Sequence, residues 1–253
     1  MSKLHISTPR PNVTLIEIDA PPANALGHSL RAELIDTLDA IENNFDMRAL
    51  ILTGRGKSFC AGDNLREAME RGGETLESLS QFGQLLDKIE QLRIPVIAAI
   101  NGAAVGGGLE LALCCDIRIG TSASKFIAAG VNVGLMASVF RLPRLIGIAR
   151  AKSMLLSGLP VSGQTALDFG LITALYEGDQ LMAEALKLAE RIASRAPLSV
   201  EASKRQSSRA FDLTPEEAAR AALKELSVLS KSKDHQLGVE AFIGRTAPAF
   251  TRG

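Results

Sequence analysis

The segment that decides the fold is IPVIAAINGAAVGGGLELALCCDIRI, residues 94–119. It begins with a short apolar run at 96–100, which predicts a buried strand, and continues into a glycine-rich turn at 101–108. Residues 109–115 then predict the start of a helix, and residues 116–120 predict a further strand. A buried strand followed by a turn, a helix and another strand is typical of a largely parallel sheet with crossover connections.

The same alternation of strands and helices extends over the first 150 residues. The other predicted strands are 13–19, 48–53 and 125–129, and the other predicted helices are 29–43 and 65–93, the second interrupted at Gly72–Gly73. From about residue 150 onward the pattern predicts helices alone, and Pro197 and Pro215 lie near the starts of two of them, where proline is tolerated. The sequence therefore predicts an α/β part followed by a C-terminal helical part.

The composition excludes several classes of protein. Lysine plus arginine and aspartate plus glutamate each number 28, so the net charge is zero and we expect no general nucleic-acid binding. Three cysteines, two of them adjacent, argue against a disulfide framework, and the first residues lack an apolar signal region, so we expect a cytoplasmic protein. Residues 94–115 contain Asn101 and Glu110, which do not suit a membrane span. The histidines share no metal-binding spacing, so we expect no metal site.

Two loops that follow buried strands carry small residues, SFCAGDNL at 58–65 and NGAAVGGGLE at 101–110. Ligands bind at the carboxyl ends of parallel strands, and small residues let a ligand approach the backbone. The N–H groups of Ala61 and Gly107 would then point at one oxygen, beside a helix start whose amides are unsatisfied, which is the arrangement of an oxyanion hole. Spacing alone equally allows that the glycines only permit close packing of the helix on the sheet.

Four segments carry a resemblance to a known family: residues 58–65, residues 94–119, SGLPVSGQTALDFGLI at 157–172 and GVEAFIGRTAPAF at 238–250. They resemble segments of the crotonase family, also called the enoyl-CoA hydratase/isomerase family, and span nearly the whole chain in the family order. The resemblance implies an α/β fold, with a spiral of ββα units at 1–195 that binds acyl-CoA and a C-terminal helical region at 196–253 for trimerisation. It also implies a homotrimer or hexamer, an acyl-CoA thioester substrate that brings coenzyme A as a part of itself, and no permanently bound cofactor.

The resemblance also implies roles for individual residues. The amides of Ala61 and Gly107 would stabilise the enolate oxygen of a thioester, and Glu110, three residues after Gly107, would move a proton at Cα. From the residues alone, Glu110 also fits a capping or packing role in the first turn of the helix, and Asp63 fits a loop-capping role. The residues implied at the coenzyme A site are Pro22, Ala23, Ala61, Gly62, Asp63, Asn64, Leu65, Gly107 and Gly130, with Phe242 and Arg245, which in the family often reach it from a neighbouring subunit.

The sequence departs from typical hydratases of the family at Gly130. Such hydratases have a second glutamate at this position, but no carboxylate lies between Phe126 and Leu142, and the following loop is shorter. We therefore expect an acyl-CoA enzyme, foremost an enoyl-CoA hydratase, in which the remaining glutamate acts alone and Asn132 or Ser138 holds the water.

Other activities stay open. VNVG at 131–134 resembles the corresponding stretch of family decarboxylases, which need the oxyanion hole but no base at position 130. The missing glutamate also fits a subunit that binds coenzyme A without catalysis. Double-bond isomerisation is less favoured, because family isomerases rely mainly on a carboxylate at position 130.

Overall fold

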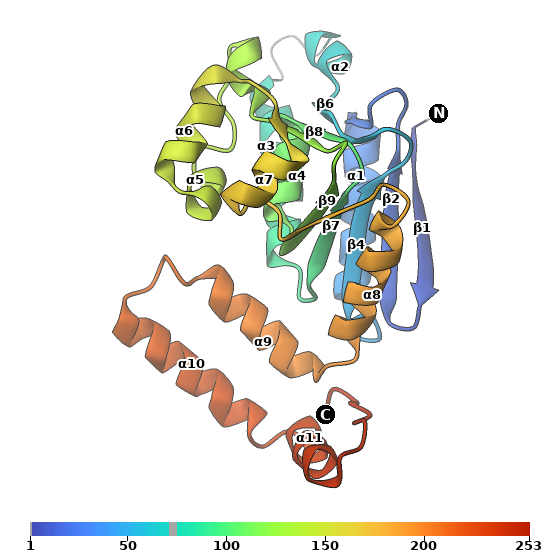
Figure 1. The fold of residues 1–253 in the computed structure, drawn as a ribbon, viewed down its shortest axis with the longest axis vertical. Coiled ribbons are helices and arrows are strands. Elements are labelled where there is room, and N and C mark those ends of the chain that lie inside the picture. Colours follow the sequence, from blue (N-terminus) through green and yellow to red (C-terminus); the bar gives the residue numbers. More distant parts are fainter. Residues whose placement is uncertain (1, 71–74) are drawn as a thin grey trace.

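The computed structural model describes residues 2–70 and 75–253 (Figure 1). A six-stranded sheet with the strand order β1-β2-β4-β7-β9-β12 forms the main layer. Its strands are β1 (Lys3–Arg10), β2 (Val13–Asp19), β4 (Ala49–Gly54), β7 (Val96–Ile100), β9 (Ile117–Thr121) and β12 (Ala174–Tyr176). β1 is antiparallel to β2, whereas the pairs from β2 to β12 are parallel. The predicted parallel sheet with crossover connections is therefore confirmed.

A smaller four-stranded sheet has the order β11-β10-β8-β5. Its strands are β5 (Ser58–Cys60), β8 (Ala103–Val105), β10 (Lys125–Ile127) and β11 (Val161–Ser162). Because β5 follows β4, β8 follows β7 and β10 follows β9, each repeat adds one strand to both sheets before a helical segment returns the chain. This repetition is the ββα spiral that the resemblance implied. Two short strands, β3 (Ala25–Leu26) and β6 (Gly62–Asp63), pair in parallel with each other.

The main sheet is buried on both faces, as the alternation of side chains along β4 shows. Ala49 and Ile51 face α8 (Leu181–Ala193), whose Leu181 belongs to the same buried cluster. Leu50 and Leu52 face the opposite cluster, to which α1 (His28–Glu42), α3 (Thr75–Gln91) and α4 (Gly107–Cys114) contribute. Each fully buried Leu or Ile contributes about 1.5–3 kcal/mol, which explains why a continuous apolar run marks this strand.

Helix α4 is buried from Gly108 to Cys114 and packs against α3, β5, β6 and β8. It begins two residues earlier than the pattern predicts, because Gly107 and Gly108 are helical although glycine is a poor helix former. The reason is space, since a methyl group on Gly108 would lie 1.9 Å from the carbonyl oxygen of Cys60. Close approach of two backbones thus overrides helix propensity here.

The segment between β10 and β12 contains four short helical elements. They are a 3₁₀ helix at Ala129–Val133, α5 (Arg141–Ile146), α6 (Ile148–Ser157) and α7 (Gly163–Phe169). The 3₁₀ helix ends at Gly134, whose left-handed φ of 73° turns the chain toward α5. This turn carries Gly130 and Ser138 to the neighbourhood of α4, which contacts α5.

Three helices follow α8 and extend away from the sheets (Figure 1). They are α9 (Pro197–Ser208), α10 (Pro215–Leu229) and α11 (Lys233–Gly244), and the first two begin at the prolines that predicted them. At the start of α10, Thr214 and Glu217 form a capping box, in which each side chain satisfies the other's backbone N–H. The predicted boundary between residues 195 and 196 falls between α8 and α9, and the division into two functional regions stays a prediction.

The prediction of helices alone after residue 150 is wrong at two short strands. β11 pairs antiparallel with β10, and β12 pairs parallel with β9. β12 covers backbone groups of β9 that would otherwise form an open edge, but three residues are too few to leave a periodic pattern. The predicted helix at 65–93 is present as α2 (Leu65–Glu70) and α3, while its predicted interruption at Gly72–Gly73 lies outside the described residues.

Across residues 2–70 and 75–253, none of the helices has both the length and the apolar character needed to cross a membrane. The apolar residues 94–115 fold mainly as β7, β8 and α4. Their hydrophobicity therefore reflects burial inside this fold.

We predict that Gly108→Ala lowers the free energy of unfolding by about 2–3 kcal/mol or more, because the added methyl group has to displace the Cys60 carbonyl. The matched control is Gly83→Ala in α3, where an added methyl group meets nothing within 4 Å. Better helix propensity should there raise the free energy of unfolding by about 0.5–1 kcal/mol. Urea unfolding measures both values, and equal effects of the two substitutions would contradict the steric argument.

Candidate active site

The two small-residue loops that follow β4 and β7 touch each other backbone to backbone. Ala61 lies between β5 and β6, and Gly107 is the first residue of α4. Gly62 has a φ of +86°, and a methyl group on it would lie 2.6 Å from the backbone nitrogen of Gly107. The structure thus brings the two predicted amide donors, Ala61 and Gly107, into one corner where glycine is needed between them.

Gly107 has the features of an oxyanion-binding donor. Because it is the first residue of α4, its N–H has no acceptor within the helix, and the helix dipole adds partial positive charge there. The preceding Gly106 donates its own N–H to the carbonyl oxygen of Ile127 at 2.9 Å, which fixes the helix start against the small sheet. Phe82 closes one side, since a methyl group on Gly107 would lie 2.7 Å from Cζ of its ring.

Glu110 lies about one helical turn after Gly107 and is buried, with 8% of the residue exposed. Its Oε1 accepts a hydrogen bond from the backbone N–H of Ser138. Its Oε2 lies 3.6 Å from Nη1 of Arg141 and forms no hydrogen bond with the residues that the structure describes. A buried carboxylate is costly unless it is paired, so these two neighbours explain how it is tolerated here. One oxygen is held by a hydrogen bond, and the other contacts a cation but accepts no hydrogen bond from the described residues.

Arg141 connects Glu110 to two carboxylates of α3. Its Nη2 lies 3.2 Å from Oδ1 of Asp87 and 2.8 Å from Oε2 of Glu90. The guanidinium also stacks on the ring of Phe140, 4.4 Å from the ring centroid. This arginine could not be predicted from the sequence, because its α3 partners are 51 and 54 residues away and no local motif indicates such pairs.

The surroundings of the buried Gly130 explain why no second glutamate is present. Its carbonyl oxygen accepts a hydrogen bond from the N–H of Leu135 at 2.8 Å, so the chain folds back over it. A methyl group on Gly130 would lie 2.9 Å from the oxygen of Leu135 and 3.0 Å from the nitrogen of Ala137. The backbone of residues 135–137 therefore occupies the space that a side chain would need. A glutamate at this position requires a different loop as well as a different residue.

The structure separates the two candidates for holding water. Asn132 is exposed, and its Nδ2 donates to the carbonyl oxygen of Gly158 at 3.1 Å. Ser138 is only 2% exposed and adjoins Glu110 through its backbone N–H. Ser138 therefore lies next to the carboxylate of Glu110, whereas Asn132 bonds Gly158.

Asp63 and Asn64 anchor the loop that carries Ala61. Oδ1 of Asp63 accepts a hydrogen bond from Nη1 of the buried Arg31 at 3.2 Å. Nδ2 of Asn64 donates to Oε1 of Glu67 at 2.8 Å, and the other oxygen of that carboxylate accepts the N–H that starts α1. The contact with Arg31 gives Asp63 a role in positioning the loop, and the contact with Glu67 does the same for Asn64.

One chain assembles only part of the predicted coenzyme A site. β3, which follows Pro22 and Ala23, pairs with β6, so residues 22–23 lie near residues 61–65. Phe242 instead lies in the last turn of α11 and Arg245 directly follows that helix, which Figure 1 shows at the opposite end of the molecule from α2 and β6. Their predicted contribution to the site of a neighbouring subunit stays a prediction.

Cys60 directly precedes Ala61 in this corner of the molecule. Burial raises the pKa of its thiol to about 12. The thiol therefore stays protonated at neutral pH, and only the thiolate is strongly nucleophilic. Proton transfer by Glu110 fits the site better than covalent chemistry by Cys60.

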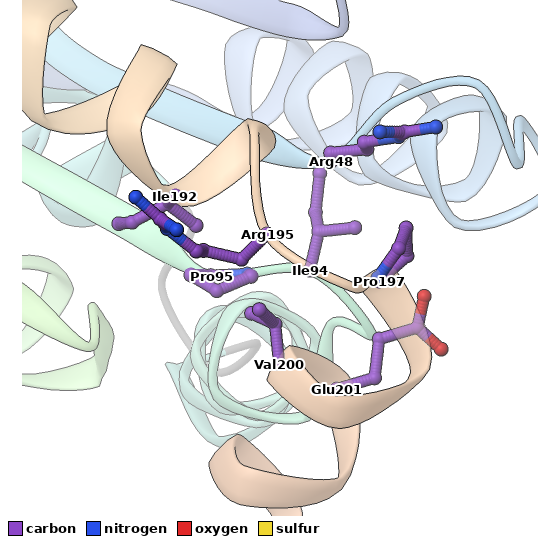
Figure 2. A pocket seen from close by; sticks show the side chains of 8 residues that line it. All are labelled: Arg48, Ile94, Pro95, Ile192, Arg195, Pro197, Val200 and Glu201. Atoms are coloured by element: carbon purple, nitrogen blue, oxygen red, sulfur yellow. The ribbon is translucent and has the colours of Figure 1, made fainter. Parts of the chain in front are cut away.

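A small cavity lies at the edge of the main sheet where β4 and β7 begin (Figure 2). It is lined by Arg48, Ile94, Pro95, Ile192, Arg195, Pro197, Val200 and Glu201. Its volume of about 10 Å³ has room for about one water molecule. It is too small for a substrate, and it lies at the edge opposite to the carboxyl ends where parallel sheets bind ligands.

Three features together define an enzyme with the crotonase fold. They are the ββα spiral, the two amides that meet at the start of a buried helix and the glutamate one turn later. The chain belongs to the enoyl-CoA hydratase/isomerase family, whose sequence profile matches residues 9–253. This membership confirms the family that the sequence motifs indicated.

Individual relatives indicate which activity within the family this chain resembles. The chain is 36% identical to the (E)-benzylidenesuccinyl-CoA hydratase of Thauera aromatica, over 94% of this chain and 95% of that protein. It is 35% identical to the short-chain-enoyl-CoA hydratase of Clostridium acetobutylicum, over 91% of each. The crystal structure of an enoyl-CoA hydratase from Bacillus anthracis matches with a TM-score of 0.96 at 32% identity, over 99% of both chains. The protein thus has an enoyl-CoA-hydratase-like function.

We predict that Arg141 and Glu110 are energetically coupled. Arg141→Met leaves the buried carboxylate without its cation and should lower the free energy of unfolding by about 3 kcal/mol. In the double variant with Glu110→Gln the buried charge is absent, so the total loss should be about 1–3 kcal/mol smaller than the sum of the single losses. Urea unfolding of the four proteins measures this cycle. Strictly additive losses would mean that the 3.6 Å contact contributes nothing to stability.

Proposed function

We propose that the protein adds water across the C2–C3 double bond of a 2-enoyl-CoA thioester, with Glu110 as its single acid–base group. The position of Glu110 carries the proposal. The carboxylate is buried one turn after Gly107, Ser138 holds one of its oxygens, and the other has no hydrogen-bond partner among the described residues. A carboxylate beside two amides that bind a carbonyl oxygen is suited to moving protons near that carbonyl.

The proposed reaction uses main-chain and side-chain groups for different tasks. The amides of Ala61 and Gly107 bind the thioester oxygen and draw electrons from C3. Glu110 accepts a proton from water as the water oxygen bonds to C3, and the electrons of the double bond form an enolate. The two amides stabilise its negative charge, and one such donor typically contributes about 100- to 1000-fold in rate. Glu110 then gives the proton to C2, which yields the 3-hydroxyacyl thioester and restores the carboxylate.

One carboxylate is enough for this sequence of steps, because the proton that Glu110 takes from water is the proton it delivers to C2. An isomerase mechanism that needs a carboxylate at position 130 finds no support, since the backbone of residues 135–137 fills that space. A malonyl-type thioester would bring its own carboxylate to the carbon beside Glu110, where like charges repel.

The hydration of crotonyl-CoA, followed by the loss of enone absorbance, tests this proposal. The wild type should hydrate the thioester, whereas Glu110→Gln should lower kcat by about 1000-fold, because an amide keeps the shape but accepts no proton. Binding of the thioester should stay close to that of the wild type. Glu216→Gln, which removes an exposed carboxylate in α10, is the control and should match the wild type.

Other results would replace the proposal. A wild type that leaves crotonyl-CoA unchanged but decarboxylates a malonyl-type thioester would be a decarboxylase. A wild type that binds coenzyme A thioesters and converts none of them would be a binding subunit. Full activity in Glu110→Gln would remove Glu110 from the mechanism.

We also propose that the chain acts as a homotrimer or hexamer in the cytoplasm, with coenzyme A as part of its substrate and no resident cofactor. Support for assembly comes from the C-terminal helices. α10 buries none of its residues within one chain. It exposes Leu223, Leu226 and Val228, and α11 exposes Phe242 and Ile243. Exposed apolar surface of this extent is typical of an interface between subunits.

The assembly prediction is tested by light scattering at micromolar concentration. The wild type should have three or six times the chain mass of 26.8 kDa. Leu226→Glu places a charge on the exposed apolar face and should shift the protein toward smaller species, whereas Lys224→Glu on the same helix should not. A monomeric wild type would contradict the proposal.

A further inference from the structure

Two buried polar atoms beside α4 have no hydrogen-bond partner within the described part of the chain. They are Oε2 of Glu110 and Oγ of Ser138. Both residues are more than nine-tenths buried, with exposures of 8% and 2%. A buried hydroxyl or carboxylate oxygen without a partner costs free energy, and such groups are normally satisfied by a polar ligand or an ordered water.

The two atoms belong to one local arrangement. The backbone N–H of Ser138 donates to Oε1 of Glu110, and Oγ is three covalent bonds from that nitrogen. The hydroxyl therefore lies close to the carboxylate that contains Oε2. Leu142 donates its N–H to the carbonyl oxygen of Ser138 at 3.2 Å, which fixes the residue to the start of α5. Hydrogen bonds thus fix both the N–H and the carbonyl group of the residue that carries the hydroxyl.

The backbone at Ser138 would favour glycine. Its φ is 61°, in the left-handed region that costs a residue with a Cβ about 1–2 kcal/mol. Strained residues that are retained at a buried polar corner point to a functional role for the side chain. The same loop fills the space beside Gly130, so it both removes room for a second carboxylate and brings a neutral hydroxyl to Glu110.

We propose that Ser138 Oγ binds the oxygen at C3 of the acyl group, as the attacking water in one direction and as the 3-hydroxyl group in the other. This inference rests on the proposed hydration. The water donates one O–H to Oε2 of Glu110 and the other to Oγ of Ser138, which leaves a lone pair for C3. Ser138 exchanges no proton itself, because Glu110 carries the proton from water to C2.

The kinetic test compares Ser138→Ala with Ser138→Gly in crotonyl-CoA hydration. Both remove the hydroxyl and should lower kcat about tenfold with little change in KM. Ser138→Gly also relieves the left-handed strain, so its urea midpoint should equal or exceed that of the wild type. Slower turnover together with unchanged or higher stability separates a role in binding oxygen from a structural role. Wild-type kcat in Ser138→Gly would overturn the proposal.

A binding test stands independently of turnover. In the Glu110→Gln background, which keeps an oxygen for the Ser138 N–H, calorimetry compares butyryl-CoA with 3-hydroxybutyryl-CoA. The hydroxylated ligand should bind about 3- to 10-fold more tightly, and adding Ser138→Ala should abolish this preference. Asn132→Ala on the same loop should keep it, because that side chain bonds Gly158 instead.

The two tests distinguish failure of this inference from failure of the proposed function. If the wild type hydrates crotonyl-CoA but the preference for the hydroxylated ligand is absent, or survives Ser138→Ala, Ser138 does not bind the C3 oxygen. If the wild type does not hydrate crotonyl-CoA while Ser138→Ala still abolishes the preference, the hydroxyl-binding role stands and the reaction has to be reassigned.

Discussion

The contact on which the rest of this structure depends is the backbone-to-backbone approach between the β5–β6 loop and the first turn of α4. It requires the absence of side chains at Gly62 and Gly108, and it allows a buried helix to begin directly against the neighbouring loop. Glu110 then follows from helix geometry, because a residue three positions after Gly107 lies about one turn away. The distance between the Gly107 amide and the carboxylate is thus set by a packed helix, which is a more rigid support than a loop.

Ion pairs stabilise the side of the site where Glu110 faces α3 and α5. α3 supplies Asp87 and Glu90, which hold Arg141, and Arg141 in turn faces Glu110. The loop before α5 is fixed at both ends, because it forms a hydrogen bond with Gly130 at one end and with Glu110 at the other. A short loop with both ends fixed leaves no space for a second acidic side chain. The single carboxylate is therefore a property of the loop as a whole.

Sequence patterns were sufficient where full burial leaves a continuous apolar run, as in β4 and β7. They were not sufficient for Glu110, whose spacing also fits a cap, so that the family resemblance was needed to suggest its role. The sequence placed Ser138 or Asn132 near the water that Glu110 activates, but it did not indicate the hydrogen bond from the Ser138 N–H to Glu110. It also did not indicate the contact of Arg141 with α3, because no periodicity encodes contacts between distant segments. The lack of space for a side chain at Gly130 likewise results from the loop that folds over it. A short strand such as β12 forms because it pairs with the open edge of a neighbouring strand.

The groups proposed to bind the thioester oxygen are main-chain atoms, which every residue type except proline supplies equally. A mutation removes them only by adding bulk or by moving the backbone. The segment 131–140, in contrast, reaches Glu110 through Ser138, and most of its residues are not buried. Natural selection can therefore exchange residues in this segment one at a time while enolate stabilisation persists. A scaffold of this kind keeps its most difficult chemical step through a change of reaction, which makes it well suited to diversification.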